Sequence, residues 1–204
     1  MILQHWKVFF RQRSKIYETV FSLFALAVLL ILYTHFLNYV ESRSGFSFDD
    51  PILRLFRPID LTWLIFGLIY ISLAAGIFYL AKDPNKFLLA VQLYSLIVIV
   101  RIIAMFLLPL NPPENIIILS DPLVEFFGSG KTLTKDLFFS GHTATLFMLG
   151  LVTAGRTRII FYTAAFLIAV SLLLQHVHYS IDVFASIIFV YAVYKFYSSI
   201  RKSK

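Results

Sequence analysis

Long apolar runs separated by short polar segments dominate the chain. Each run ends at a cluster of charged residues, prolines or glycines, which are typical helix ends and turns. Most runs are close to the roughly 20 residues that a helix needs to cross a bilayer. The pattern predicts an all-α polytopic membrane protein with six transmembrane helices, whose expected bounds are 17–40, 61–81, 87–108, 140–155, 158–175 and 179–200.

The same pattern divides the chain into three parts. These are a basic flank at 1–16, a membrane domain at 17–200 and a basic tail at 201–204. The first apolar run is too long for a cleaved signal peptide and lacks a small-residue cleavage site, so we expect it to be the first spanning helix. Aromatic and basic side chains are interleaved in the flank, which favours a segment lying along an anionic membrane surface.

Composition supports this class of protein. Of 204 residues, 59% are hydrophobic and 14% are charged, with a mean hydropathy of +0.82, whereas a soluble domain carries about a quarter charged residues. The net charge of +7 is compatible with nucleic-acid binding. Lys and Arg also gather at the cytoplasmic ends of membrane helices, so we expect no nucleic-acid partner. The chain has no cysteine, which excludes disulfides and thiolate metal sites.

The distribution of basic residues predicts the topology. With a cytoplasmic N-terminus, the inner segments hold twelve Lys and Arg and the outer segments five, which with Arg101 makes the 18 of the chain. This bias predicts that both termini are cytoplasmic. The ionisable residues His142, His178, Asp182, Asp60 and Arg101 then all lie toward the non-cytoplasmic face.

His178 and Asp182 are four residues apart, which places them on one face of a helix. A carboxylate in this position can hold one imidazole nitrogen and leave the lone pair of the other free to attack. A His and an Asp that simply cap a helix start in a wet interface are the alternative. His176 does not share this face. It could support the site or lie on the side of the lipid headgroup, and we expect it to be structural rather than catalytic.

His142 follows Ser140 and Gly141 at the predicted start of a helix. A glycine permits close approach of a ligand, and the first turn of a helix attracts anions. A lone histidine here would be unremarkable, but two histidine sites on one membrane face, one with a partnering Asp182, favour catalysis. The same residues match a two-His, one-carboxylate iron site, although nothing else in the chain indicates redox chemistry.

Arg101 lies seven residues inside the third apolar run, about 10 Å deep at 1.5 Å per residue. An arginine at such a depth is costly, by about 2.5–3.5 kcal/mol at a helix centre. It either extends its head toward the interface or binds a phosphate, and we favour phosphate binding.

Two features occur between the third and fourth runs. Asp121 and Pro122, followed by Gly128, predict a short interfacial helix over 122–127. The segment 128–132 ends in Gly-Lys-Thr, like a nucleotide-binding loop. That motif needs a further glycine three positions before Gly128 and a preceding strand, so we interpret it as an ordinary loop.

Two motifs carry a family resemblance. They read Asp136-x-x-x-Ser140-Gly141-His142-Thr143 and His178-Tyr179-Ser180-x-Asp182-Val183. In their order, spacing and position among six predicted spans, they resemble the sphingomyelin synthase family, a branch of the type-2 phosphatidic acid phosphatase superfamily.

The resemblance implies a reaction and a role for each residue. His178 is the expected nucleophile, Asp182 activates it, and His142 assists at the leaving or incoming oxygen. The expected reaction moves phosphocholine or phosphoethanolamine from a glycerophospholipid of the outer leaflet to a lipid alcohol such as ceramide, through a phosphohistidine and without a metal or other cofactor. Substrate contacts are predicted at Arg101, Ser140, Gly141, Asp136 and Tyr179.

The chain also departs from the family pattern. Thr134-Lys135 replaces its Cys-Gly, and its arginine-rich third-helix motif is reduced to Arg101. The sequence therefore does not select between choline and ethanolamine. A lipid phosphate phosphatase, which hydrolyses a phosphatidic-acid-like substrate with water in place of the lipid alcohol, is the alternative. That branch carries an arginine where Leu172 stands and a lysine where Asp50 stands, so hydrolysis is the weaker interpretation.

Overall fold

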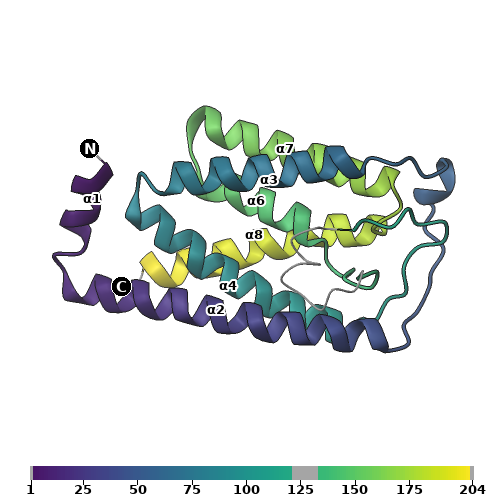
Figure 1. Ribbon diagram of the computed structural model, residues 1–204, viewed down its shortest axis with the longest axis horizontal. Helices are drawn as coiled ribbons and strands as arrows, with labels where there is room; N and C mark the ends of the chain where they lie inside the picture. Colours follow the sequence, from purple (N-terminus) through teal and green to yellow (C-terminus); the bar gives the residue numbers. More distant parts are fainter. Residues whose placement is uncertain (1, 121–132, 203–204) are drawn as a thin grey trace.

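The computed structural model describes residues 2–120 and 133–202, and α-helices occupy most of them (Figure 1). The described parts contain no β-strand, only an isolated bridge between Phe46 and Leu110. The predicted all-α class is thus confirmed. The expected helix 122–127 and the loop 128–132 lie outside the described residues. The helices are α1 (Ile2–Phe9), α2 (Arg13–Ser42), α3 (Thr62–Leu80), α4 (Pro84–Leu107), α6 (Gly141–Val152), α7 (Gly155–Leu174) and α8 (Ser180–Lys202).

Five of these helices, namely α2, α3, α4, α7 and α8, are long and apolar enough to cross a membrane. They correspond to five of the six predicted spans, and their ends agree with the predicted bounds to within a few residues. The chain is therefore an integral membrane protein. The sixth predicted span corresponds to α6, which is apolar but shorter than the others.

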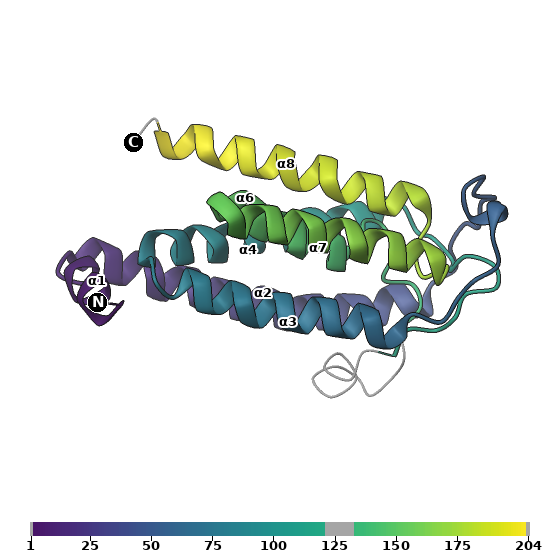
Figure 2. The ribbon, with the colours of Figure 1, turned by 90° about the horizontal axis from the view of Figure 1, so that it is seen from above.

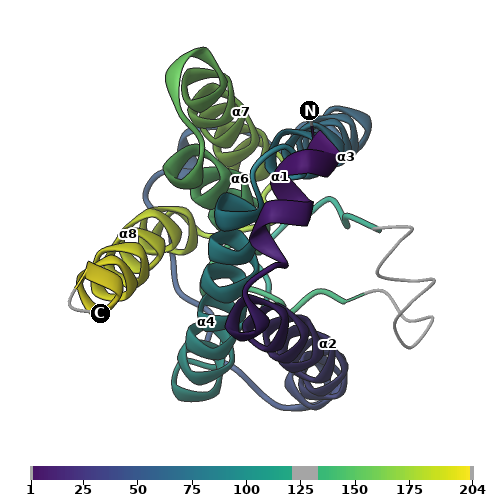
Figure 3. The ribbon, with the colours of Figure 1, turned by 90° about the vertical axis from the view of Figure 1, so that its left-hand side faces the viewer.

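The short helix α6 forms the centre of the bundle. It packs against α7, α8 and α4, as the end-on view shows (Figure 3). Eight of its twelve residues are buried, as expected for a mostly apolar helix at the centre of a bundle. Its packing on α7 is close because of Gly150, where an added Cβ would lie 2.3 Å from the Tyr162 ring.

The length of α6 differs from the predicted 140–155. The helix starts after Ser140, whose hydroxyl accepts a hydrogen bond from the Thr143 N–H, and it ends where Thr153 becomes extended. Its twelve residues span about 18 Å at 1.5 Å per residue, less than the roughly 30 Å of a bilayer core. Helix α6 therefore starts inside the bundle, deeper than α8 (Figure 1).

The first two helices lie at the edge of the molecule. Helix α2 packs chiefly on α4 and buries few residues. Helix α1 forms part of the predicted flank and is held to the α3–α4 turn, where the Trp6 indole N–H donates to the Ala81 carbonyl over 2.7 Å. The Trp6 ring also lies 5.6 Å from the Phe87 ring. The flank is thus partly helical and bonded to protein, and its contact with lipid remains a prediction.

Two connecting segments, 43–61 and 108–120, cross at the opposite end of the bundle (Figure 2). The Phe46 N–H donates to the Pro109 carbonyl over 2.8 Å, and the Asn111 N–H donates to the Phe46 carbonyl over 2.9 Å. Helices α6 and α8 both start toward this end (Figure 1). The fold therefore brings both histidine motifs to one end of the bundle. Which membrane face this end occupies remains a prediction.

Candidate active site

His178 and Asp182 form a buried pair at the start of α8. His178 Nδ1 lies 3.2 Å from Asp182 Oδ2, and the two side chains are 3% and 0% exposed. Because a carboxylate only accepts hydrogen bonds, the contact places a proton on Nδ1, and in the neutral ring Nε2 then carries the lone pair. The sequence spacing anticipated this contact, while the catalytic role of the pair remains a prediction.

The Asp182 carboxylate is only partly satisfied. Its Oδ2 accepts a second hydrogen bond, from the Tyr179 N–H, over 3.1 Å. Its Oδ1 is buried without a hydrogen-bond partner among the residues that the structure describes. A buried carboxylate that lacks full solvation favours positive charge beside it. The pair is therefore suited to stabilise a cationic His178 ring.

A backbone hydrogen bond joins the two motifs. The Ser140 N–H donates to the Asp182 carbonyl over 3.2 Å, so the starts of α6 and α8 are adjacent. His142 lies in the first turn of α6, where its side chain is half-buried. The helix dipole places partial positive charge at this turn. The fold thus brings His142 into the neighbourhood of the His178–Asp182 pair.

Arg101 is the centre of a second buried polar cluster. It is 6% exposed, and its guanidinium contacts three protein groups. Nε donates to the Phe139 carbonyl over 2.9 Å, and Nη2 donates to Asp136 Oδ1 over 2.7 Å. Nη1 bonds to the Tyr33 hydroxyl, which in turn donates to Asp136 Oδ1 over 3.0 Å. Arg101 therefore does not extend into lipid but holds the segment that leads into α6.

The Arg101 cluster explains how irregular backbone is accommodated below the ends of the long helices. Non-helical chain at membrane depth is tolerated where protein groups satisfy its hydrogen bonds. Arg101 does so for Phe139, and Glu41 accepts from the Thr134 and Lys135 N–H groups over 2.9 Å each. Gly141 permits this arrangement because an added Cβ would lie 2.6 Å from Arg101 Nη1. A direct contact of Arg101 or Asp136 with substrate remains a prediction.

Asp50 fixes the start of α8, a role that the sequence analysis did not anticipate. Its Oδ2 accepts from the Ser180 N–H over 2.6 Å, and its Oδ1 accepts from the Ile52 N–H over 2.9 Å. Burial alone would raise the pKa of Asp50, but these N–H donors outweigh it and the pKa lies below its usual value. Asp50 precedes Pro51 in a polar linker, a common turn signal, but its distant partner Ser180 cannot be read from the sequence.

Tyr179 and Gln175 organise the chain on either side of His178. The Tyr179 hydroxyl donates to the Asn111 carbonyl over 3.1 Å, and its ring stacks on Phe48 at 4.0 Å between centroids. Gln175 is fully buried, and its Oε1 accepts from the Leu61 N–H over 2.9 Å. Both side chains thus tie the 175–179 segment to the connecting segments. The predicted contact of Tyr179 with substrate remains a prediction.

The described residues contain no cluster of three or more His, Asp or Glu side chains that could hold a metal ion. The two-histidine iron site considered from the sequence would require such a cluster.

Comparison with known proteins is consistent with this arrangement. No curated protein sequence matches the chain. The family model described as PAP2 superfamily C-terminal matches residues 135–199, which include both histidine motifs and helices α6, α7 and most of α8. The superfamily contains phosphatases and phosphotransferases. Residues 135–199 are thus similar to the C-terminal part of the type-2 phosphatidic acid phosphatase superfamily, and the match does not select a branch of it.

Proposed function

We propose that the protein is a lipid phosphotransferase that moves a phosphoryl headgroup from a glycerophospholipid to a lipid alcohol such as ceramide. The observation that carries the proposal is the buried His178–Asp182 contact of 3.2 Å, joined to the His142 helix start by the Ser140–Asp182 backbone bond. The matched family model adds support for chemistry on lipid phosphate.

The first half-reaction forms a covalent intermediate. The His178 Nε2 lone pair attacks the donor phosphorus, a P–N bond forms, and the P–O bond to diacylglycerol breaks. Protonated His142 gives its proton to the leaving oxygen. The phosphorylated ring carries positive charge next to Asp182, whose carboxylate stabilises it because both are excluded from water.

The second half-reaction resolves the intermediate. The hydroxyl of the lipid alcohol loses its proton to neutral His142, and its oxygen attacks the phosphorus. The P–N bond breaks, and His178 regains its lone pair. Ser140 and Gly141 position the first turn of α6, whose dipole favours the phosphate oxygens.

Hydrolysis is the second candidate function, because the matched superfamily includes phosphatases. It differs only in the second step, in which water takes the place of the lipid alcohol. Purified protein with labelled phosphatidylcholine or phosphatidylethanolamine, with and without ceramide, separates the two by mass spectrometry of the products. Transfer to ceramide supports the proposal. Release of free headgroup phosphate, unchanged by ceramide, identifies a hydrolase and contradicts it.

The covalent step has its own test. We expect an acid-labile, alkali-stable phosphohistidine that His178→Ala abolishes together with turnover. His142→Ala should slow the first step by roughly 10²–10⁴-fold, and a nitrophenyl phosphodiester donor should restore that step because its leaving group needs little protonation. If His142→Ala is as inactive on this donor as His178→Ala, in folded protein, the assigned roles are wrong.

We also propose that the site faces away from the cytoplasm, on the basis of the twelve-to-five distribution of basic residues. Because the chain has no cysteine, single cysteines can report each face without background. Ser44 is an exposed residue of the 43–61 segment, and Asn85 is an exposed residue at the α3–α4 turn. Each is replaced by cysteine in a separate variant. An impermeant thiol reagent on intact cells should label Ser44→Cys alone. Labelling of Asn85→Cys alone would reverse the topology.

A further inference from the structure

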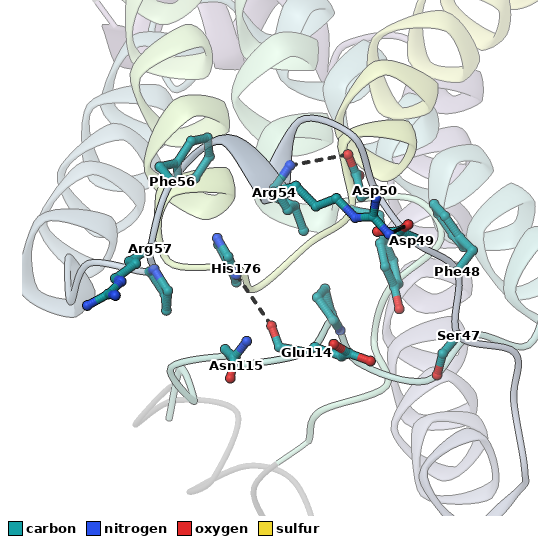
Figure 4. Close-up of a pocket in the computed structure, with 14 residues that line it drawn as sticks. Ser47, Phe48, Asp49, Asp50, Arg54, Phe56, Arg57, Glu114, Asn115 and His176 are labelled. Atoms are coloured by element: carbon teal, nitrogen blue, oxygen red, sulfur yellow. Dashed lines mark hydrogen bonds and ion pairs between the residues drawn. The ribbon is translucent and has the colours of Figure 1, made fainter.

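A cavity of about 820 Å³ opens at the end of the bundle that carries both motifs (Figure 4). It is lined by residues between Ser47 and Pro58, by the 113–115 segment, and by His176 and Tyr179. Its volume is within the roughly 300–1,000 Å³ range of small-ligand sites. His176 and Tyr179 flank His178 in the chain, so the cavity lies next to the proposed nucleophile's segment and beyond the ends of the apolar helices.

His176 is held in this cavity wall in an unusual way. Its φ is +57°, a left-handed conformation that non-glycine residues rarely adopt. The side chain is 5% exposed, and its Nε2 is buried without a hydrogen-bond partner among the described residues. Strained backbone and unsatisfied buried polar atoms are concentrated at functional sites. His176 therefore deserves a functional explanation.

The tautomer of His176 follows from its other nitrogen. Nδ1 lies 3.4 Å from the Glu114 main-chain oxygen (Figure 4). A carbonyl oxygen only accepts hydrogen bonds, so Nδ1 carries the proton, and Nε2 of the neutral ring presents a lone pair. The missing partner of Nε2 is consequently a hydrogen-bond donor, such as an ammonium N–H.

The charged groups of the cavity favour a zwitterionic ligand. Asp49 is paired with Arg54, and Asp50 is occupied by backbone N–H groups. The exposed Glu114 carboxylate and Arg57 guanidinium form no ion pair with another described residue. Glu114 complements an ammonium group, and Arg57 complements a phosphate.

We propose that this cavity binds the phosphoethanolamine headgroup of the donor lipid, with its primary ammonium donating to His176 Nε2 and to the Glu114 carboxylate. The inference rests on the proposed headgroup transfer, and it selects ethanolamine over choline. A quaternary ammonium has no N–H, so it would leave the His176 lone pair buried and unsatisfied at a cost of about 1–3 kcal/mol.

The aromatic residues of the cavity do not offset that loss for choline. A quaternary ammonium is usually held against open aromatic faces. The Tyr179 ring is stacked on Phe48 at 4.0 Å between centroids, and the Phe56 ring meets His176 edge-on at 5.5 Å. The outer side of Phe48, which is 41% exposed, is thus the main aromatic surface left in the cavity, and the other rings pack on Phe48 or on His176 rather than completing a cage.

Equilibrium binding tests the inference without turnover. In a His178→Ala background, binding of soluble glycerophosphoethanolamine and glycerophosphocholine is compared by calorimetry on detergent-purified protein. We expect the ethanolamine compound to bind roughly ten-fold more tightly, which corresponds to one satisfied hydrogen bond of this kind. Equal binding of the two, or tighter binding of the choline compound, would overturn the inference even if lipid transfer is demonstrated.

Two substitutions assign the preference to these side chains. His176→Asn suits the backbone, because asparagine tolerates positive φ, and its shorter side chain leaves the ammonium without its acceptor. Glu114→Gln, in an exposed segment, tests the carboxylate without disturbing the core. His176→Asn should weaken binding of the ethanolamine compound about ten-fold and leave the choline compound unchanged. Glu114→Gln removes a charge that attracts both ammonium groups, so it should weaken both compounds, and the ethanolamine compound more because it also loses a hydrogen bond. The matched control is Asp49→Asn, which removes a carboxylate of the same cavity that is already paired with Arg54, and it should preserve the preference.

Transfer assays separate this inference from the proposed function. Active protein should transfer from phosphatidylethanolamine in preference to phosphatidylcholine, and His176→Asn should remove the preference by lowering transfer from phosphatidylethanolamine alone. An equal loss on both donors would mean that His176 serves the phosphate, and the inference fails. If no lipid is transferred but binding remains selective and depends on His176, the proposed function fails and the headgroup site stands.

Discussion

The Arg101 cluster and the His178–Asp182 pair are both buried and charged, but they differ in how fully they are satisfied. Each of the three guanidinium nitrogens of Arg101 contacts a protein acceptor. In the other cluster, Asp182 Oδ1 has no partner among the described residues. The first cluster is complete without a ligand, whereas the second retains unused hydrogen-bonding capacity.

This difference separates a structural role from a chemical one. Charged groups in a low-dielectric interior are stabilising only when their partners are in place. The Arg101 cluster meets that condition and fixes the loop before α6. In the His178–Asp182 pair the carboxylate still lacks a partner for one oxygen. A cationic phosphohistidine beside Asp182 would supply the missing positive charge during the reaction. Substitutions should therefore affect folding in the first cluster and chemistry in the second.

The largest expected effect is that of Asp182→Asn. The amide oxygen can still accept from the Tyr179 N–H and from His178 Nδ1, but the amide carries no negative charge, so the cationic ring that forms on His178 loses the partner that stabilises it. The analogous change in catalytic triads lowers kcat about 10⁴-fold. Turnover on phosphatidylethanolamine and ceramide, together with the yield of phosphohistidine, measures it. A variant with unchanged melting temperature and near-normal turnover would show that the pair is structural.

Arg101→Lys should act mainly on stability. A point charge cannot reproduce the three directions of the guanidinium fork, so at least one buried partner loses its hydrogen bond, at a cost of about 1–3 kcal/mol. We expect a lower melting temperature in detergent and a loss of activity that follows unfolding. If Arg101 instead binds phosphate directly, the variant should keep its melting temperature and show a raised KM. Tyr33→Phe is the matched control. It removes the hydroxyl that bonds to Arg101 and Asp136, and it leaves the Arg101 guanidinium in place.

The sequence was sufficient for the long membrane helices and for the spacing of the His178–Asp182 pair. Apolar runs, prolines and charged turns specify helix ends locally, and so the bounds of α3, α4 and α8 were predicted to within a few residues. The four-residue spacing of His178 and Asp182 specifies a shared helix face through the geometry of one element alone.

Contacts between distant segments could not be predicted from local sequence pattern. The loop before α6 is held by Arg101, which lies 38 residues before Phe139 in the chain. The bond of Asp50 to Ser180 spans 130 residues. Neither partner is signalled by local pattern, because both contacts are fixed by how the bundle packs. The unsatisfied nitrogen of His176 likewise became visible only with its surroundings.

Asp50→Asn sharpens the comparison with a more moderate effect. If Oδ1 keeps the Ile52 N–H, the amide nitrogen meets the Ser180 N–H, and two donors face each other. We expect a loss of about 1–3 kcal/mol in the free energy of unfolding, measured as a lower melting temperature at pH 7.

Because the pKa of Asp50 is lowered in the folded protein, its stabilisation is present above the ordinary pKa of about 4 and is lost as pH falls below it. The difference between wild type and variant should thus be constant from pH 6 to pH 8, which are about 2 to 4 units above that pKa, and it should shrink in acid. A difference that grows in acid would contradict the assignment.

The smallest expected effect is that of Tyr179→Phe, which tests whether this residue belongs to the fold or to the reaction. Its hydroxyl donates a neutral hydrogen bond to the Asn111 carbonyl over 3.1 Å and also interacts with Ser47 and with the Phe48 main chain. A neutral hydrogen bond contributes about 0.5–1.5 kcal/mol. The ring and its stacking on Phe48 are retained in the variant. We therefore expect a slightly lower melting temperature and a kcat within a few-fold of wild type.

The contrast with Asp182→Asn is informative, because the two residues are three positions apart and both are buried. If Tyr179→Phe instead lowers kcat by orders of magnitude while the melting temperature is unchanged, its hydroxyl contacts the reacting lipid. The hydrogen bond to Asn111 would then be a resting arrangement that the substrate replaces.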